Sequence, residues 1–235
     1  MRNYVETKSL VPVLRKEQFD GEATKFLQEF YPQALEKPMF IPILDIAKKK
    51  LGLIVCTKQR LSEDFSIYGQ MCFTSGIVDL YDKEQDEFRE HKVRYGTMFI
   101  DPDTFYLRNL GCFNNTATHE SVHWWKDRNY YLAVNTSGNP KSIAFRCPGK
   151  APDEDHQEKW TDEDWIEWQT NGIAARILMP KQTFERQVRA IENNLVRKEG
   201  IHHPSADLVV RRTSEFFHTS IQSTAIRMEE LSVTA

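Results

Sequence analysis

The sequence predicts an α+β protein, and two features of the residue pattern indicate this class. Residues 53–101 are rich in β-branched and aromatic residues, which acidic or glycine-containing breaks divide into short runs. Segments with apolar residues at helical spacing lie on both sides of this region. The chain has 235 residues, a length that fits one good-sized domain or a domain with a small appendage, and its 40 % hydrophobic and 28 % charged residues are typical of a soluble globular protein.

The N-terminal part is expected to contain two helices and then the strands. In residues 16–30 the apolar residues recur at helical spacing, which predicts an amphipathic helix. Residues 42–51 predict a shorter helix with Pro42 in its first turn. The runs within residues 53–101 predict three to five strands of a mostly antiparallel sheet.

The middle of the chain is expected to contain a helix and then a long loop. Residues 114–131 predict the helix, with Asn114 or Asn115 as its N-cap. Residues 135–160 contain glycines, prolines and an acidic run, so we expect a loop there, with a short strand at residues 142–147.

The C-terminal part is expected to be helical. The pattern from Lys181 onward has helical spacing and is broken at residues 200–204, which contain a glycine and a proline. We therefore divide the chain into a main domain, residues 1–183, and a small helical element, residues 184–235.

Charge, cysteines and hydropathy favour a cytoplasmic protein. The net charge of −3 provides no electrostatic reason to expect nucleic acid or an anionic membrane as a partner. The four cysteines are scattered without a CxxC pair, as thiols in a reducing compartment are. The first 20 residues lack the apolar segment of a secretion signal, and no run approaches 18 uncharged apolar residues.

The most informative motif is His-Glu-Ser-Val-His at residues 119–123. Residues four apart on a helix share a face, so His119 and His123 can direct their imidazoles to a single metal ion. Glu120 follows the first histidine and is placed to act on a metal-bound water as a general base. The alternative is a solvated helix that carries two surface histidines.

A zinc site of this kind needs a third protein ligand and an open position for water, and Glu167 is the candidate. Thr161 and Asp164 have the spacing of a capping box, which predicts a helix over residues 162–179. The face that carries Glu167 has mostly short side chains, so the helix can approach another helix closely. The alternatives are that Glu167 is an exposed carboxylate or that Glu163 or Asp164 is the third ligand.

Several other residues are weaker candidates for chemistry. His202 and His203 lie beside a proline in an expected loop and have no matched carboxylate. His91 is expected in a strand or turn. A second donor to the oxyanion of the reaction is also expected, and Tyr130, Tyr131 and His91 are candidates for that role.

The tryptophans and Cys147 are interpreted mainly as structural residues. Cys147 is expected to be a core thiol, because a sulfur ligand there would close the zinc site and remove the position of the catalytic water. The tryptophans are expected in the core and in the wall of the cleft, with peptide binding by one of them as the alternative; they are Trp124, Trp125, Trp160, Trp165 and Trp168.

These motifs resemble the ImmA/IrrE family of metallo-endopeptidases. The family has an HExxH helix followed by a helix of the form Glu-x-x-Ala-x-x-Phe-Ala-x-x-Leu-Leu-Met-Pro, and this chain has HESVHWW and, 48 residues after the first histidine, EWQTNGIAARILMP. RYGTMFIDPDTF, at residues 94–105, looks like the family's strand before the catalytic helix. The last helical residues look like the helix-turn-helix-like tail of longer bacterial members. The resemblance covers most of residues 16–232.

The resemblance implies a zincin-like metalloprotease core, meaning a small mostly antiparallel sheet, the HExxH helix and the Glu-bearing helix, with a helical C-terminal appendage. It implies one Zn²⁺ per chain on His119, His123 and Glu167, with Glu120 as the catalytic residue. It also implies a protein substrate, since family members cleave helix-turn-helix transcriptional repressors in bacteria and thereby derepress genes of phages or mobile elements. Thr170 and Ile173 stand where the family usually has Ala and Phe.

Two other functions compete with a peptidase. The chain can be a regulatory protein that keeps the fold and sequesters a repressor without cutting it, although a pure binding protein has no need of Glu120. It can also bind DNA through its C-terminal element. Residues 181–235, however, contain eight Lys and Arg against seven Asp and Glu, so the cationic patch that phosphate contact requires is missing.

Overall fold

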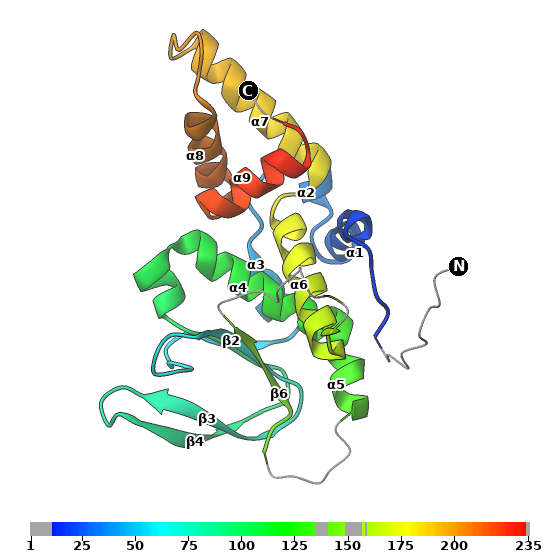
Figure 1. Cartoon of the computed structure of the whole chain (residues 1–235), viewed down its shortest axis with the longest axis vertical. Coiled ribbons are helices and arrows are strands. Elements are labelled where there is room, and N and C mark those ends of the chain that lie inside the picture. Colours follow the sequence, from blue (N-terminus) through cyan, green and yellow to red (C-terminus); the bar gives the residue numbers. More distant parts are fainter. Residues whose placement is uncertain (1–10, 135–140, 149–156, 158, 234–235) are drawn as a thin grey trace.

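The computed structural model describes residues 11–134, 141–148, 157 and 159–233 and shows an α+β fold with a small mixed sheet (Figure 1). The α-helices are α1 (Phe19–Phe30), α2 (Gln33–Glu36), α3 (Ile43–Lys49), α4 (Leu110–Val122), α5 (Arg128–Val134), α6 (Asp162–Leu178), α7 (Lys181–Arg197), α8 (Ala206–Phe217) and α9 (Ile221–Glu230). A 3-10 turn, η1 (Lys16–Gln18), precedes α1, and the π-helical segments η2 (Thr104–Arg108) and η3 (His123–Asp127) flank α4. The strands are β1 (Ile54–Cys56), β2 (Ile67–Cys72), β3 (Gly76–Asp82), β4 (Glu87–Val93), β5 (Thr97–Ile100) and β6 (Ala144–Pro148).

The sheet has the strand order β1-β5-β2-β6. β1 and β5 are parallel, whereas β5, β2 and β6 are antiparallel neighbours. The prediction of three to five strands within residues 53–101 is confirmed, as is the strand expected at residues 142–147. The strands do not form one sheet, because β3 and β4 pair only with each other as a separate hairpin among the named strands.

Each face of the sheet covers its own apolar core. Met71 of β2 lies opposite Met98 of β5, and both belong to the main core under the helices. Their neighbours Cys72 and Phe99 point to the other face, because successive residues of a strand alternate, and belong to a smaller core under the hairpin. Figure 1 shows α4 above the sheet and the β3–β4 hairpin below it. The sheet therefore supports the helix that carries the His-Glu-Ser-Val-His motif.

The predicted N-cap of that helix is wrong. The helix begins at Leu110, and Asn109 is its N-cap, with its side chain accepting a hydrogen bond from the Cys112 amide at 2.9 Å. Asn114 lies inside the helix and instead donates its Nδ2 to the His218 carbonyl at 3.0 Å. Helix spacing predicts the helix but not its first residue, since every asparagine in this segment is a suitable cap by type.

The C-terminal helices share the main core with the rest of the chain. Phe184 and Val188 of α7, Val209 of α8 and Met228 of α9 are buried within it. The expected division between residues 183 and 184 falls inside α7. Most of the loop expected at residues 135–160 lies outside the described residues. No helix in the described part of the chain is both long and apolar enough to cross a membrane.

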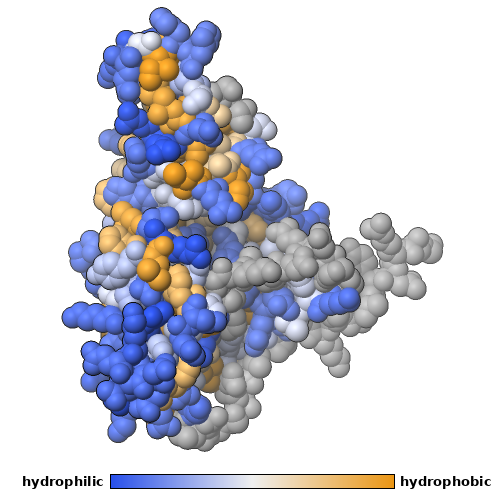
Figure 2. All heavy atoms as spheres, turned by 60° about the vertical axis from the view of Figure 1, so that its left-hand side comes forward, coloured by the Kyte–Doolittle hydropathy of each residue, from blue (hydrophilic) through white to orange (hydrophobic). Residues whose placement is uncertain are grey.

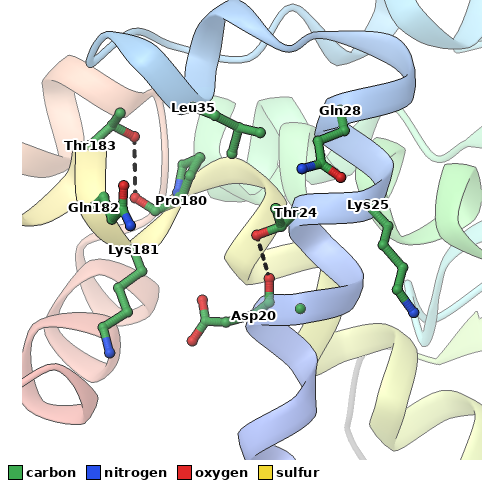
Figure 3. A pocket seen from close by; sticks show the side chains of 10 residues that line it. Asp20, Thr24, Lys25, Gln28, Leu35, Pro180, Lys181, Gln182 and Thr183 are labelled. Carbon is green, nitrogen blue, oxygen red and sulfur yellow. Dashed lines mark hydrogen bonds between the residues drawn. The ribbon is translucent and has the colours of Figure 1, made fainter.

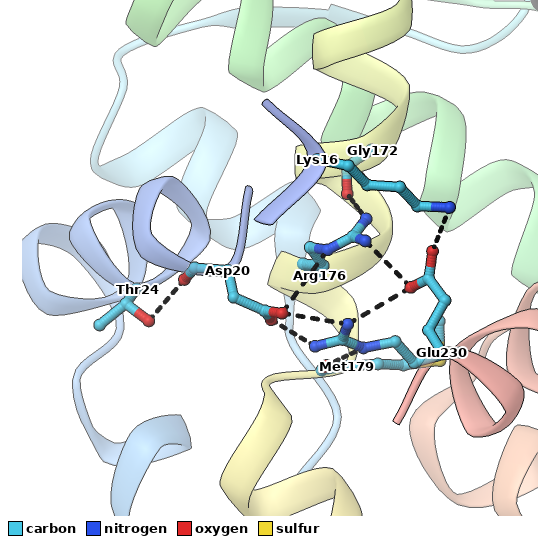
Figure 4. A network of polar contacts seen from close by, with 8 residues as sticks. Lys16, Asp20, Thr24, Gly172, Arg176, Met179 and Glu230 are labelled. Atoms are coloured by element: carbon cyan, nitrogen blue, oxygen red, sulfur yellow. Dashed lines mark hydrogen bonds and ion pairs between the residues drawn. The ribbon is translucent and has the colours of Figure 1, made fainter. Parts of the chain in front are cut away.

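A network of charged side chains connects α9 to α1 and α6 (Figure 4). Asp20 of α1 pairs with Arg227 of α9, whose side chain is 2 % exposed. Arg176 of α6 donates to Glu230 of α9 at 3.0 Å and to the Gly172 carbonyl at 2.9 Å. The C-terminal element is thus attached to the helix that carries Glu167.

Candidate metal centre

Helices α4 and α6 pack against each other. His119 of α4, His123 at the start of η3 and Glu167 of α6, the three predicted ligands, thereby meet at one point. The Nε2 atoms of His119 and His123 lie 2.8 Å apart. Oε1 of Glu167 lies 2.8 Å from Nε2 of His123 and 3.3 Å from Nε2 of His119. The two histidines are fully buried and Glu167 is 4 % exposed, so the solvated-helix alternative does not apply. A fully buried Ala174 on the same face of α6 allows the close approach.

This arrangement fits a small cation. Tetrahedral zinc with bonds of about 2.0–2.1 Å separates its ligand atoms by about 3.3 Å. The distance from His119 to Glu167 matches this value, and the two distances from His123 are shorter, at 2.8 Å. Three acceptor atoms at such distances repel one another unless they share a proton or a metal ion. Oε2 of Glu167 is also buried without a hydrogen-bond partner in the described structure. Two imidazoles and one carboxylate are a donor set that zinc accepts.

A second set of residues orients the two imidazoles. Nδ1 of His119 lies 3.1 Å from Oδ1 of Asn171, and Nδ1 of His123 lies 3.1 Å from Oδ2 of Asp127. An oxygen acceptor at each Nδ1 leaves the Nε2 lone pair directed to the common point. Asp127 also accepts bonds from Lys126 at 2.7 Å and from Thr170 at 3.2 Å. Sequence reasoning did not identify Asp127, although its spacing of four residues from His123 is a signal.

His123 and Asp127 are the first and last residues of the π-helical segment η3. Such segments are rare and occur often at functional sites. The segment is inserted between α4 and α5, where the sequence predicts one continuous helix. Hydrophobic spacing does not distinguish the two helix types over so short a length.

A carboxylate oxygen of Glu120 lies within 4.8 Å of a ligand nitrogen of His119, and the side chain packs against the sheet. It is fully buried, and neither carboxylate oxygen has a hydrogen-bond partner in the described structure. It faces Gly69 of β2, where a Cβ atom would approach Oε1 of Glu120 more closely than any non-bonded contact allows. Glycine is therefore required at this point of the strand by close approach and not by its dihedral angles. The carboxylate is available to a ligand of the centre.

The ionisable groups of the centre are strongly coupled. Burial raises the pKa of Glu120 to about 8, although the charge of His123 opposes the shift. Burial disfavours the charged form of His123, but hydrogen bonds to Asp127 and Glu167 outweigh it and raise its pKa to about 10. Burial also acts against the ionised form of Glu167, but the charges and hydrogen bonds of both histidines lower its pKa to about 2. In the absence of metal the centre therefore retains protons, which a cation would replace.

The rival third ligands lie elsewhere. Asp164 accepts bonds from the amide and hydroxyl of Thr161, so it is engaged in the predicted capping box, and that box is confirmed. Glu163 is exposed. Neither joins a group that could hold a metal ion within the described structure.

The weaker histidine candidates lie apart from the centre. His91 is an exposed residue of β4, in the hairpin on the opposite face of the sheet from α4. His202 and His203 are exposed in the turn between α7 and α8. None of the three belongs to a potential metal-binding group of the described residues.

Aromatic residues form the surroundings of the centre. Tyr131 is 4 % exposed, and its ring centroid lies 6.3 Å from that of His123. Burial raises its pKa well above the ordinary value, so its hydroxyl stays protonated and can donate. Tyr130 is only half-buried. Trp124 packs against Phe73 at 6.3 Å in the main core, as the structural interpretation of the tryptophans expects.

Cys147 is buried, as predicted for a core thiol, and it also lies near the metal centre. It is a buried residue of β6, and its sulfur, a ligand nitrogen of His119 and a carboxylate oxygen of Glu120 all lie within 4.8 Å of one another.

An open hollow of about 430 Å³ lies away from this centre, between α1, α2 and the start of α7 (Figure 3). Asp20, Thr24, Leu35 and Thr183 are among its lining residues. It includes neither the ligand residues nor Glu120, and its lining contains no cluster of ligand atoms. The buried centre is the more chemically specific of the two sites.

Comparison of the sequence with protein-family models and with curated proteins finds no match.

Proposed function

We propose that the protein is a zinc-dependent endopeptidase of the ImmA/IrrE type, with a zincin-like core. The observation that supports this most strongly is the convergence of His119, His123 and Glu167 on one point beside the Glu120 carboxylate. Helix α4 with the adjoining η3, and helix α6 far along the sequence, provide these groups, and a solvated helix has no reason to bury them together. The Leu-Met-Pro ending of α6 and the family-like order of the two motifs support the same proposal.

The proposed site holds one Zn²⁺ per chain on His119, His123 and Glu167. Zinc with three protein ligands lowers the pKa of a bound water to about 7 and polarises a carbonyl group. Asn171 and Asp127 orient the two imidazoles through their Nδ1 atoms. Glu120 accepts the proton of the attacking water and delivers it to the leaving amine nitrogen.

The protonation of Glu120 is compatible with this role. Burial raises its pKa to about 8 in the metal-free protein, so the carboxyl group is largely neutral at pH 7. A divalent cation close to Glu120 favours the ionised form, which is the form that accepts a proton. The base is thus most effective when the site is loaded.

The proposed substrate is a helix-turn-helix transcriptional repressor, whose cleavage derepresses genes of a bacterium or mobile element. The family resemblance is the source of this proposal. The C-terminal element adds a surface on which a protein can bind. Its exposed apolar residues include Phe216, Ile221 and Ile226, and Figure 2 shows hydrophobic groups in a band along this upper part of the molecule.

The test compares the wild type with Glu120→Gln, both loaded with zinc and incubated with a purified helix-turn-helix repressor encoded beside the gene. Unfolded casein serves as a second probe that needs no specific docking. Intact mass is measured over time. The expected result is cleavage by the wild type, with a rate lower by about 10²–10⁴ in Glu120→Gln.

Glu163→Gln is the matched control, because Glu163 is an exposed glutamate on α6. This variant should cleave both probes as fast as the wild type does. Equal cleavage by wild type and Glu120→Gln would show that Glu120 is not the base. Tight binding of the repressor by both, with no cleavage of either probe, would favour sequestration without proteolysis.

A further inference from the structure

The thiol of Cys147 lies beside the Glu120 carboxylate, on the face of the sheet that packs against α4. Gly69 of β2 lies directly opposite Cys147 of β6 in the antiparallel register. Residues opposite each other in such a pair direct their side chains to the same face. The Cβ position of Gly69 points at Glu120, so the side chain of Cys147 also lies on the Glu120 side of the sheet.

The ligand distances agree with this register argument. The sulfur of Cys147 lies within 4.8 Å of both a His119 ligand nitrogen and a Glu120 carboxylate oxygen. It does not join the group of His119, His123 and Glu167, so its binding to a cation held there requires a shift of the sulfur toward those three residues. Cys147 is 6 % exposed, and Glu120 is fully buried with neither oxygen hydrogen-bonded in the described structure. A carboxylate without a partner therefore faces the same space as the thiol. Cys72, on the opposite face of the same sheet, belongs to the small core under the hairpin and joins no potential metal-binding group of the described residues.

We propose that Cys147 is a removable fourth ligand of the metal centre, which switches it between a closed and an open state. The proposal rests on the proposed function, because it needs a cation on His119, His123 and Glu167. Thiolate sulfur is a preferred ligand of zinc, and zinc sites with four protein ligands are closed, whereas catalytic sites keep one position for water.

The exchange is balanced as follows. In the closed state the thiol of Cys147 would give its proton to the Glu120 carboxylate, and its sulfur would replace the water that a bound cation would otherwise hold. In the open state the proton would return to sulfur, the water would bind again, and Glu120 would be a carboxylate able to accept a proton. One group therefore removes both the water and the base at the same time.

The position of Cys147 on β6 makes such an exchange feasible. In the sheet order β1-β5-β2-β6, β6 is an edge strand, hydrogen-bonded to β2 alone among the described strands. An edge strand is attached on one side only, so a displacement breaks fewer backbone hydrogen bonds than in β5 or β2. Movement of β6 away from α4 would withdraw the sulfur and leave the ligands on α4 and α6 in place.

The experiment uses Co²⁺ alone as the probe, because a thiolate bound to Co²⁺ has a charge-transfer absorption in the near ultraviolet that nitrogen and oxygen ligands lack. The full chain is freed of metal, one equivalent of Co²⁺ is added, and bound cobalt and the spectrum are measured. We expect the band in the wild type, its loss in Cys147→Ser and Cys147→Ala, and its retention in Cys72→Ser. Cys72→Ser is the matched control, since Cys72 is a buried thiol of the same sheet.

The outcomes separate this inference from the proposed function. Bound cobalt without the band in the wild type would overturn the role of Cys147 and leave the metal centre intact. A band that persists in both Cys147 variants would assign the thiolate to another cysteine and would also overturn it. No bound cobalt at all would overturn the metal centre and this inference together.

Discussion

The imidazole of His123 donates a hydrogen bond from Nδ1 to Oδ2 of Asp127, with 3.1 Å between the two atoms. The bond is buried, and Thr170 donates to the same oxygen at 3.2 Å. Thr170 stands where the ImmA/IrrE family, which this sequence resembles, usually has Ala. An alanine could not donate to Asp127, so this hydrogen bond is a feature of this sequence. The bond determines which nitrogen of His123 faces the metal centre.

Loss of this bond should weaken metal binding without removing a ligand. We expect Asp127→Ala to lower zinc affinity by about 10–100-fold, as loss of an orienting partner does. Asp127→Asn retains an acceptor oxygen and should lose less. The measurement is competition with a chromophoric chelator at fixed pH. Equal affinity in wild type and Asp127→Ala would show that Asp127 does not orient His123.

Metal stoichiometry tests the ligand assignment directly. One zinc per chain is expected, and His119→Ala, His123→Ala or Glu167→Ala should remove most of it, because three protein ligands are the minimum for this type of site. Elemental analysis after gel filtration measures the content. Full zinc in all three variants would contradict the assignment.

The acidic neighbours on α6 are the controls for that experiment. Glu163→Gln and Asp164→Asn should retain zinc, since Glu163 is exposed and Asp164 is engaged with Thr161 in the capping box. Asp164→Asn should cost about 1 kcal/mol of stability through the weakened cap. Loss of zinc in either control, with retention in Glu167→Gln, would mean that a different face of α6 meets α4.

The absence of a side chain at Gly69 should be necessary for the Glu120 carboxylate to keep its position. In Gly69→Ala the new Cβ meets Glu120, and it would also lie 2.8 Å from Cγ2 of Thr116. We expect a loss of about 1–3 kcal/mol in the free energy of unfolding, as overpacking costs, together with slower cleavage and unchanged zinc content. Gly21→Ala is the control, since nothing lies within 4 Å of its Cβ and alanine favours a helix. Wild-type stability in Gly69→Ala would contradict the close packing.

The cluster of His119, His123 and Glu167 was predictable from sequence because most of its determinants are local. The spacing of His119 and His123 places them on one helix face, and the capping box at Thr161 determines where α6 begins and hence which face carries Glu167. The contacts of Gly69 and Cys147 depend on how the sheet packs against α4. No spacing within a strand reveals such a contact, so the sequence predicted the centre but not the sheet residues around it.

The fold was predictable to a similar degree. Strand composition predicts strands within residues 53–101, but it does not determine which strands pair, and the separate β3–β4 hairpin follows from tertiary packing of a second small core. Likewise, the N-cap at Asn109 and the π-helical residues 123–127 depend on backbone geometry that residue type specifies weakly.

The metal-free protein should become less stable as the pH rises from about 6.5 to 10. Both His123 and Glu120 have a folded-state pKa above the ordinary values of 6.5 and 4.5, at about 10 and about 8. The contribution of each group to the stability of the folded state is therefore fully present below its ordinary pKa. It is lost as the pH rises through its pKa in the folded state. Thermal midpoints in EDTA measure this loss, and Glu120→Gln should show a smaller decrease up to pH 8.

Zinc should reverse the trend. Metal binding needs neutral histidines and an ionised carboxylate, so the stabilisation by zinc increases with pH as protons leave the centre. The same thermal series with saturating zinc should show a difference between loaded and metal-free protein that is larger at pH 8.5 than at pH 6. A metal-free midpoint that rises over this range would contradict the pKa directions of His123 and Glu120.

Arg227 should attach the C-terminal element to the rest of the protein. Its side chain is 2 % exposed and donates to Asp20, to Glu230 at 3.4 Å and to the Met179 carbonyl at 3.3 Å. Arg227→Met removes one of the two arginines that pair with Asp20 and Glu230, and Arg176 still reaches both carboxylates. Removal of one partner of a buried ion pair costs about 3–5 kcal/mol. We expect a loss in the free energy of unfolding at the lower end of this range, because solvent reaches Asp20, whose side chain is 34 % exposed. Urea unfolding measures the change, with Arg212→Met as the control; its exposed pair with Glu199, at 3.4 Å, should contribute about 0–1 kcal/mol. Zinc content should stay at one per chain, since Arg227 makes no contact with the ligands. If both variants unfold at the same urea concentration, the network does not hold α9 against α1 and α6, and the apolar contacts of Met228 in the main core are sufficient for that attachment.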